Sequence, residues 1–136
     1  MIGIVVVTHG DLACAMVKTV ELVIGPQAAL EPVCLNAFEG LDDLKAKVSE
    51  AIAKAGKESG GNVLIFTDMF GGSTTNVSLQ FISEKVEILT GINLPMLLES
   101  LLLRESLRDP RALAKDVAEK AKKSIIPMSE IQKTWQ

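Results

Sequence analysis

The sequence predicts an α/β domain of three layers, in which a mainly parallel four-stranded sheet is flanked by helices. Short, β-branched apolar runs alternate four times with segments of helical periodicity, a pattern typical of parallel strands connected by helical crossovers. Several runs are almost continuously apolar, as expected for strands that are buried on both faces. The length of 136 residues and the 48% apolar content fit one domain, which we expect at 1–127 with a C-terminal tail at 128–136.

The ends of the expected elements coincide with characteristic residues. Gly25-Pro26 ends the first helix, Pro32 places its strand at a sheet edge or a strand start, and Asn93 is a helix N-cap. Helical spacing predicts Leu12 and Leu41 on buried faces. The expected elements are strands at 2–9, 30–35, 62–67 and 85–89, and helices at 12–24, 41–57, 74–82, 94–104 and 110–123.

Composition excludes several classes of function. The net charge is −3, and no basic stripe with interleaved aromatic residues appears, which argues against nucleic-acid binding. No apolar run reaches roughly 18 residues, and no targeting segment precedes the first strand, so we expect a cytoplasmic protein without direct membrane insertion. Cys14 and Cys34 are expected to be small buried side chains. Because no residues have metal-ligand or nucleotide-binding spacing, we expect no metal and no cofactor.

The only histidine, His9, ends the first expected strand. Ligands of open parallel sheets bind beyond the carboxyl ends of the strands, and imidazole is the side chain best suited to titrate near neutral pH. If the first and third strands are neighbours, Asp68 faces His9. Its carboxylate would then accept a hydrogen bond from one ring nitrogen and leave the other free as a nucleophile. The alternatives are a half-buried histidine without chemistry and an aspartate that caps the next helix.

A second loop, Gly71-Gly72-Ser73, follows Asp68. Two glycines allow backbone amides to approach an anion closely, and the next helix directs its positive end toward the same place. The Ser73 hydroxyl can donate to a phosphoryl oxygen or cap the helix, and the two roles are compatible. Such turns are common and often only geometric, but together with His9 and Asp68 they predict a site that receives a phosphoryl group on histidine. Gly10, Gly71, Gly72 and Ser73 are the expected phosphoryl-binding residues.

Three motifs resemble one known family. The runs IVVVTHGDLA, FTDMFGGS and LTGINLPMLLESLL, within positions 1–104, are similar to enzyme IIA of the mannose family of the phosphoenolpyruvate-dependent sugar phosphotransferase system. The resemblance implies that His9 is phosphorylated, that Asp68 is its hydrogen-bonding partner and that Ser73 lies beside the phosphoryl group. One departure is that Thr74 and Thr75 stand where the family commonly has Pro-Phe, which removes a dihedral angle preset for the helix start.

The resemblance also implies partners. The phosphoryl group would arrive from the histidine-containing phosphocarrier protein and leave to enzyme IIB, and then to a sugar at the membrane permease. The family forms homodimers that exchange a C-terminal strand, and residues 124–127 are the candidate for an additional, antiparallel strand here.

Two alternatives stay open, one within phosphoryl transfer and one from another class, that of binding or regulatory modules. The first is the phosphotransfer subunit of dihydroxyacetone kinase, whose typical turn has serine where this chain has Gly10. The second is a regulatory sensor of sugar supply phosphorylated on the same histidine. A flavodoxin-like binding module would need a Ser/Thr-rich loop after the first strand, and that loop is absent.

Overall fold

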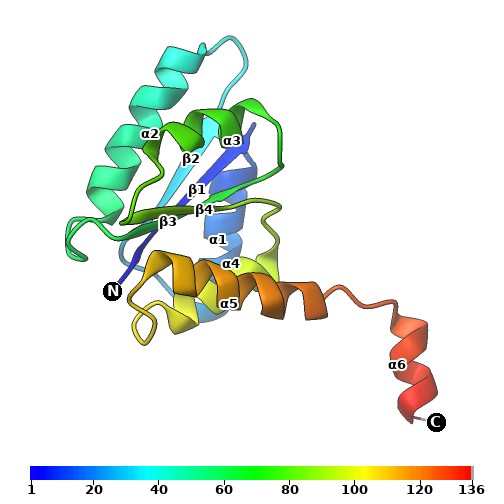
Figure 1. Ribbon diagram of the computed structural model, residues 1–136. Helices are drawn as coiled ribbons and strands as arrows, with labels where there is room; N and C mark the ends of the chain where they lie inside the picture. Colours follow the sequence, from blue (N-terminus) through cyan, green and yellow to red (C-terminus); the bar gives the residue numbers. More distant parts are fainter. Residues whose placement is uncertain (136) are drawn as a thin grey trace.

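The computed structural model of the protein describes the backbone of residues 1–135 and the side chains of residues 1–131. Four parallel strands form one sheet in the order β2-β1-β3-β4 (Figure 1). β1 and β3 are therefore the two central strands, as their apolar sequences predict. The strand bounds are β1 Gly3–His9, β2 Leu30–Leu35, β3 Val63–Thr67 and β4 Val86–Leu89.

Helices cover both faces of the sheet and complete the predicted three layers. Successive side chains of β1 point to opposite faces, so Ile4 and Val6 enter one apolar core while Val5 and Val7 enter the other. All four are fully buried, because each face of β1 is covered by helices. On the first face lie α1 Leu12–Ile24, α4 Leu94–Leu103 and α5 Pro110–Lys123; on the second lie α2 Leu41–Ala55, α3 Ser73–Ser78 and the 3₁₀ turn η1 Leu79–Phe81.

Local signals in the sequence account for most element ends. The Asn93 side chain accepts a hydrogen bond from the Met96 backbone N–H at 2.9 Å and begins α4, as predicted. Gly25, with a φ of 83°, ends α1. Pro32 lies on the edge strand β2, where its missing N–H removes no bond of the ladder. The third helix is shorter than predicted, because α3 ends at Ser78 and continues as the 3₁₀ turn.

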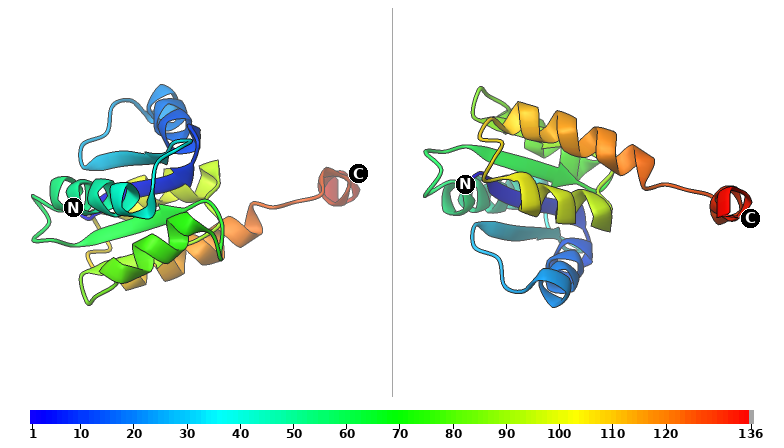
Figure 2. Two further views of the ribbon diagram at one scale, coloured as in Figure 1. Left: turned by 90° about the horizontal axis from the view of Figure 1, so that it is seen from above. Right: turned by 90° about the horizontal axis from the view of Figure 1, so that it is seen from below.

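The C-terminal segment differs from the prediction. Ser124 caps α5, and residues 125–127 form no strand but lead away from the sheet (Figures 1 and 2). The expected tail forms a further helix, α6 Met128–Trp135, which stands apart from the other elements in all the views. An additional strand is therefore wrong for the single chain, and strand exchange in a dimer stays a prediction. Gln136, the last residue of the expected tail, lies outside the described residues.

The two cysteines are partly exposed rather than buried. Cys14 lies in α1 and Cys34 in β2, and their Sγ atoms are 3.0 Å apart as free thiols. Burial and the contact with Cys14 raise the pKa of the Cys34 thiol. α1 thus packs on the edge strand β2 through this pair of sulfur atoms. Because 20 residues separate the two cysteines, the sequence did not reveal the contact.

Candidate functional site

The turns after β1 and β3 meet at the carboxyl edge of the sheet. Val7 of β1 pairs in register with Thr67, the last residue of β3, so the two strands end within two residues of the same level. His9 ends β1, and Asp68 directly follows β3. Parallel pairing of neighbouring strands therefore brings two side chains 59 positions apart into contact.

Asp68 binds His9 through a single carboxylate oxygen. Its Oδ2 atom accepts the His9 backbone N–H at 2.9 Å and lies 2.8 Å from the ring Nδ1. An ionised carboxylate only accepts hydrogen bonds, so Nδ1 is the donor and Nε2 of the neutral ring has the free lone pair. The His9 side chain is 45% exposed, and no described side chain hydrogen-bonds Nε2. One ring nitrogen is thus held by the protein, and the other has no hydrogen-bond partner among the described side chains.

The surroundings of Asp68 keep it ionised. Partial burial alone raises its pKa, but hydrogen bonds from the His9 backbone N–H, the Thr74 hydroxyl and the His9 ring outweigh burial, so the pKa lies below its ordinary value. Thr74 Oγ1 donates to Asp68 Oδ1 at 2.7 Å. Both carboxylate oxygens therefore have donors, and at neutral pH a negative charge lies beside the imidazole.

A second hydroxyl fixes the loop between β3 and α3. Thr75 Oγ1 donates to the Met69 carbonyl at 2.6 Å and lies 2.7 Å from Thr67 Oγ1. Thr67, Thr74 and Thr75 are almost completely buried. Because β-branched side chains are stiff at χ1, these bonds fix the path of the backbone on both sides of Asp68.

Gly72 lies so close to the His9 ring that a side chain at this position would crowd it. A Cβ atom built on Gly72 would lie 3.1 Å from Cε1 of His9 and 3.2 Å from Cγ of Met69. Both distances are tighter than ordinary van der Waals contact. The absence of a side chain at Gly72 thus leaves space beside Cε1, the ring carbon between the two nitrogens of His9.

The other expected phosphoryl-binding residues lie around this edge with different roles in the fold. Gly10 has a φ of 57°, which favours glycine, and its N–H donates to the Leu35 carbonyl at 2.9 Å. Gly71 also has a positive φ, of 83°. Ser73 is the first residue of α3 and follows the N-cap Gly72. Its role in binding a phosphoryl group stays a prediction.

The sequence missed two features of the site. Thr74 was noted only as a replacement for proline, although a threonine six residues after Asp68 in a Gly-Gly turn is a local signal for a hydroxyl close to the carboxylate. The second feature is a group of exposed apolar side chains in the loops and helix starts at the same sheet edge. The group comprises Leu12, Phe38, Leu41, Met69 and Phe70.

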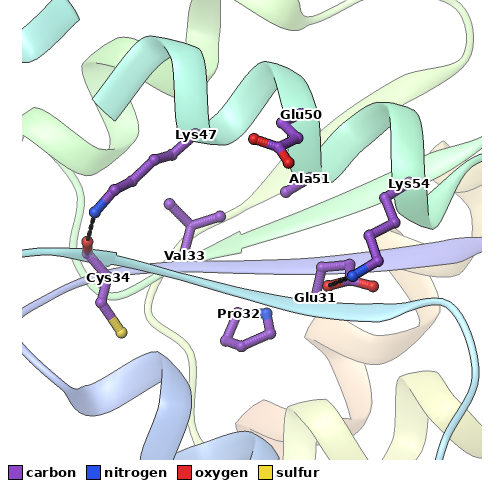
Figure 3. Close-up of a pocket in the computed structure, with 8 residues that line it drawn as sticks. All are labelled: Glu31, Pro32, Val33, Cys34, Lys47, Glu50, Ala51 and Lys54. Atoms are coloured by element: carbon purple, nitrogen blue, oxygen red, sulfur yellow. Dashed lines mark hydrogen bonds and ion pairs between the residues drawn. The ribbon is translucent and has the colours of Figure 1, made fainter. Parts of the chain in front are cut away.

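A separate hollow lies between β2 and α2 (Figure 3). Its two lysines are engaged: Lys47 donates to the Cys34 carbonyl at 3.1 Å and pairs with Glu39, and Lys54 lies 3.5 Å from Glu31. None of the expected site residues lines it. The lining residues are Glu31, Pro32, Val33, Cys34, Lys47, Glu50, Ala51 and Lys54.

Two other features are absent from the described residues, a metal-binding cluster and a membrane-spanning helix. No three side chains of His, Cys, Asp or Glu converge there as a metal ion would require. Within the same part of the chain, every helix is too short or too polar to cross a lipid bilayer.

The fold, with a histidine and an aspartate at its carboxyl edge, is that of a phosphotransferase system (PTS) enzyme IIA. The family described as "PTS system fructose IIA component" (EIIA-man) matches residues 3–121, and the chain belongs to this family. The expected resemblance to mannose-type enzyme IIA is thereby confirmed. Members of this family belong to the general class of phosphotransferases.

Curated relatives agree with this assignment. The fructose-specific EIIA component of the PTS from Bacillus subtilis is 34% identical over 109 residues, which cover 79% of this chain and 73% of that protein. The mannose-specific EIIAB component from Escherichia coli K12 is 33% identical over 106 residues. That match covers 76% of this chain but 32% of the EIIAB protein, so the chain spans about a third of that relative.

Solved structures share the fold over almost the whole chain. The EIIA phosphotransferase component from Streptococcus agalactiae superimposes with a TM-score of 0.85 at 25% identity and covers 96% of this chain and 99% of its own. A mannose/sorbose-specific IIA subunit from Enterococcus faecalis, at 21% identity, has a TM-score of 0.81 and covers 93% of each chain. The likeness to the second structure concerns the fold alone.

Proposed function

We propose that the protein is a phosphohistidine carrier, with Nε2 of His9 as the atom that accepts and releases the phosphoryl group. The observation that carries this proposal is the division of the ring: Asp68 binds Nδ1, whereas Nε2 has no partner among the described side chains and belongs to a half-exposed side chain. A nucleophile that meets another protein must be exposed, and its tautomer must be held from the inner side.

The proposed transfer involves one bond made and one broken. The Nε2 lone pair attacks the phosphorus of a donor phosphohistidine, the donor's P–N bond breaks, and its electron pair stays with the leaving imidazole. The proton on Nδ1 remains in place, so the His9 ring becomes cationic as the new P–N bond forms. Asp68 stabilises that cation by charge and by hydrogen bond. The reverse sequence releases the group to the next histidine.

The proposed donor and acceptor are proteins. The donor would be the histidine-containing phosphocarrier protein and the acceptor enzyme IIB, which passes the group to a sugar at the membrane permease. The exposed apolar side chains at the same sheet edge, among them Phe38 and Phe70, support a protein partner, because large apolar groups around a reactive atom are typical of docking surfaces.

Sugar uptake is favoured over the two alternatives. The relatives named above are fructose- and mannose-specific components, and a sorbose-specific EIIA component from Lacticaseibacillus casei is 35% identical over 98 residues. We expect the selectivity for one sugar to reside in the membrane partner. The dihydroxyacetone kinase subunit and the regulatory sensor would use the same phosphohistidine chemistry at His9.

We further propose a cytoplasmic homodimer. Ile125, Ile126 and Met128 are exposed on the segment that leaves the body of the chain, which supports a second copy covering them. Size-exclusion chromatography with light scattering tests this proposal: a dimer is expected, and it should dissociate when Ile125 and Ile126 are both replaced by serine. A monomeric wild-type protein would contradict it.

Labelling with radioactive phosphoenolpyruvate, enzyme I and the histidine-containing phosphocarrier protein tests the carrier function. The wild-type protein should accumulate label that is lost in acid and kept in base, as a phosphoramidate is. His9→Ala should accumulate no label, because it lacks the proposed nucleophile and differs from the wild type at no other residue. Labelled His9→Ala, or an acid-stable adduct on the wild type, would assign the phosphoryl group to another residue.

A further inference from the structure

The Asp68 carboxylate is held from two sides by different elements. Its Oδ2 atom binds the backbone and ring of His9 from β1, whereas its Oδ1 atom accepts the Thr74 hydroxyl from α3 at 2.7 Å. A carboxylate held only at Oδ2 can rotate about its terminal torsion, which has a broad, two-fold profile. A donor on the second oxygen fixes the plane of the group.

The Thr74 hydroxyl is suited to this task. Thr74 is fully buried, and its β-branched side chain has a restricted χ1, which limits the positions that Oγ1 can take. The hydroxyl does not cap α3, whose N-cap is Gly72. Since an ionised carboxylate cannot donate, the hydroxyl proton must point to Asp68.

We propose that Thr74 is a positioning residue for phosphoryl transfer: its hydroxyl fixes the orientation of the Asp68 carboxylate and thereby keeps the His9 proton on Nδ1 and the lone pair on Nε2. This inference deepens the proposed function and rests on it. Thr74 does not touch the reacting atoms; it acts through Asp68. Loss of the hydroxyl should let the carboxylate turn and allow the other tautomer of the ring to form.

The experiment uses the fact that His9 is the only histidine in the chain, so every imidazole nitrogen signal belongs to it. We would record long-range ¹H–¹⁵N spectra of the unphosphorylated full chain at a pH where the ring is neutral. In the wild type the Nδ1–H tautomer should dominate. In Thr74→Val, which keeps the shape and removes the hydroxyl, a clear fraction of the Nε2–H tautomer should appear. Thr74→Ser, which restores a donor, should return the spectrum to that of the wild type.

Thr75→Val is the matched control. Thr75 is the next residue of the same helix, is also buried and also loses a hydroxyl, but its partners are Met69 and Thr67 rather than Asp68. Both valine variants should lose stability, and only Thr74→Val should change the tautomer ratio. Labelling of Thr74→Val by the phosphocarrier protein should be slower by about tenfold. If Thr74→Val does not fold, Thr74→Ala replaces it.

The outcomes separate this inference from the proposed function. An unchanged tautomer ratio in Thr74→Val, or an equal change in Thr75→Val, would overturn the role of Thr74 while wild-type labelling leaves the carrier function intact. Failure of the wild type to accept label would overturn the carrier function, whereas the tautomer spectra would still decide whether Thr74 orients Asp68.

Discussion

The turns after the two central strands differ in how firmly the structure holds them. Two residues, Gly10 and Asp11, separate β1 from α1, and the Asp11 side chain makes no capping hydrogen bond. The turn after β3 is longer, and buried threonine hydroxyls bind both its Asp68 carboxylate and its Met69 carbonyl. The first turn presents an exposed imidazole, and the second holds it in place.

This difference has a physical reason. A histidine that meets a partner protein must remain exposed, so few side chains can surround it. The positioning groups are then best placed on the neighbouring strand end, where the bonds are buried and less screened by water. Substitutions in the second turn should therefore alter the behaviour of His9 without touching it.

Asp68→Asn should have the largest effect on transfer. An amide oxygen still accepts the Nδ1 proton, but a neutral group does not stabilise the cationic ring. We expect labelling to slow by about 100-fold with the fold retained. Rapid-quench labelling measures the rate, and circular dichroism checks the fold. A wild-type rate in this variant would remove Asp68 from the mechanism.

Gly72→Ala should have an intermediate effect. The added Cβ would lie 3.1 Å from Cε1 of His9, so the ring or the loop must shift by a few tenths of an ångström. We expect the labelling rate to fall roughly three- to tenfold. Gly71→Ala is the matched control: Gly71 has a positive φ but open space around it, so alanine strains the backbone without touching the ring. Equal rates for the two variants would show that ring contact is unimportant.

Gly10→Ala should act on stability. The φ of 57° disfavours alanine, while no atom lies within 4 Å of the added Cβ. Strain without a clash should cost about 1 kcal/mol, measurable as a lower urea midpoint at unchanged slope. A midpoint equal to that of the wild type would show that the turn after β1 adapts to alanine at no cost in stability. The two turns would then differ even more in how firmly they are held.

The smallest expected effect is on the stability of the folded chain in acid. The pKa of Asp68 lies lower in the folded than in the unfolded chain, so the unfolded chain binds more protons as pH falls. The stability that Asp68 contributes is present above its unfolded pKa of about 3.9 and is lost as pH falls through the folded pKa. Urea unfolding should show a steeper acid loss for the wild type than for Asp68→Asn. Parallel curves would contradict the lowered pKa.

The sequence predicted the positions of His9 and Asp68 in the two turns better than the hydrogen bonds that hold the second turn. Continuous apolar runs placed β1 and β3 in the centre, and neighbouring parallel strands then brought His9 beside Asp68. The partners of the hydroxyls were harder to predict. The position of Thr74 in the Gly-Gly turn indicated a hydroxyl near Asp68, but a threonine can cap a helix, bond within it or face water, and the backbone path decides which.

Periodicity also failed at the site edge. Leu12 and Leu41 were expected on buried faces, but both are exposed. Each begins its helix at the carboxyl edge, where the helix extends past the sheet and no core remains to cover it. The spacing of apolar residues predicts which face of a helix is apolar, but not where along the helix the core ends.

The proposed transfer requires that Nε2 of His9, and not Nδ1, carries the phosphoryl group. Phosphorylation of ¹⁵N-histidine-labelled protein, followed by ³¹P–¹⁵N coupling measurements, identifies that nitrogen directly, because the chain has one histidine. Coupling of phosphorus to Nε2 is the predicted result. Phosphorus on Nδ1, the nitrogen that Asp68 binds, would contradict the account.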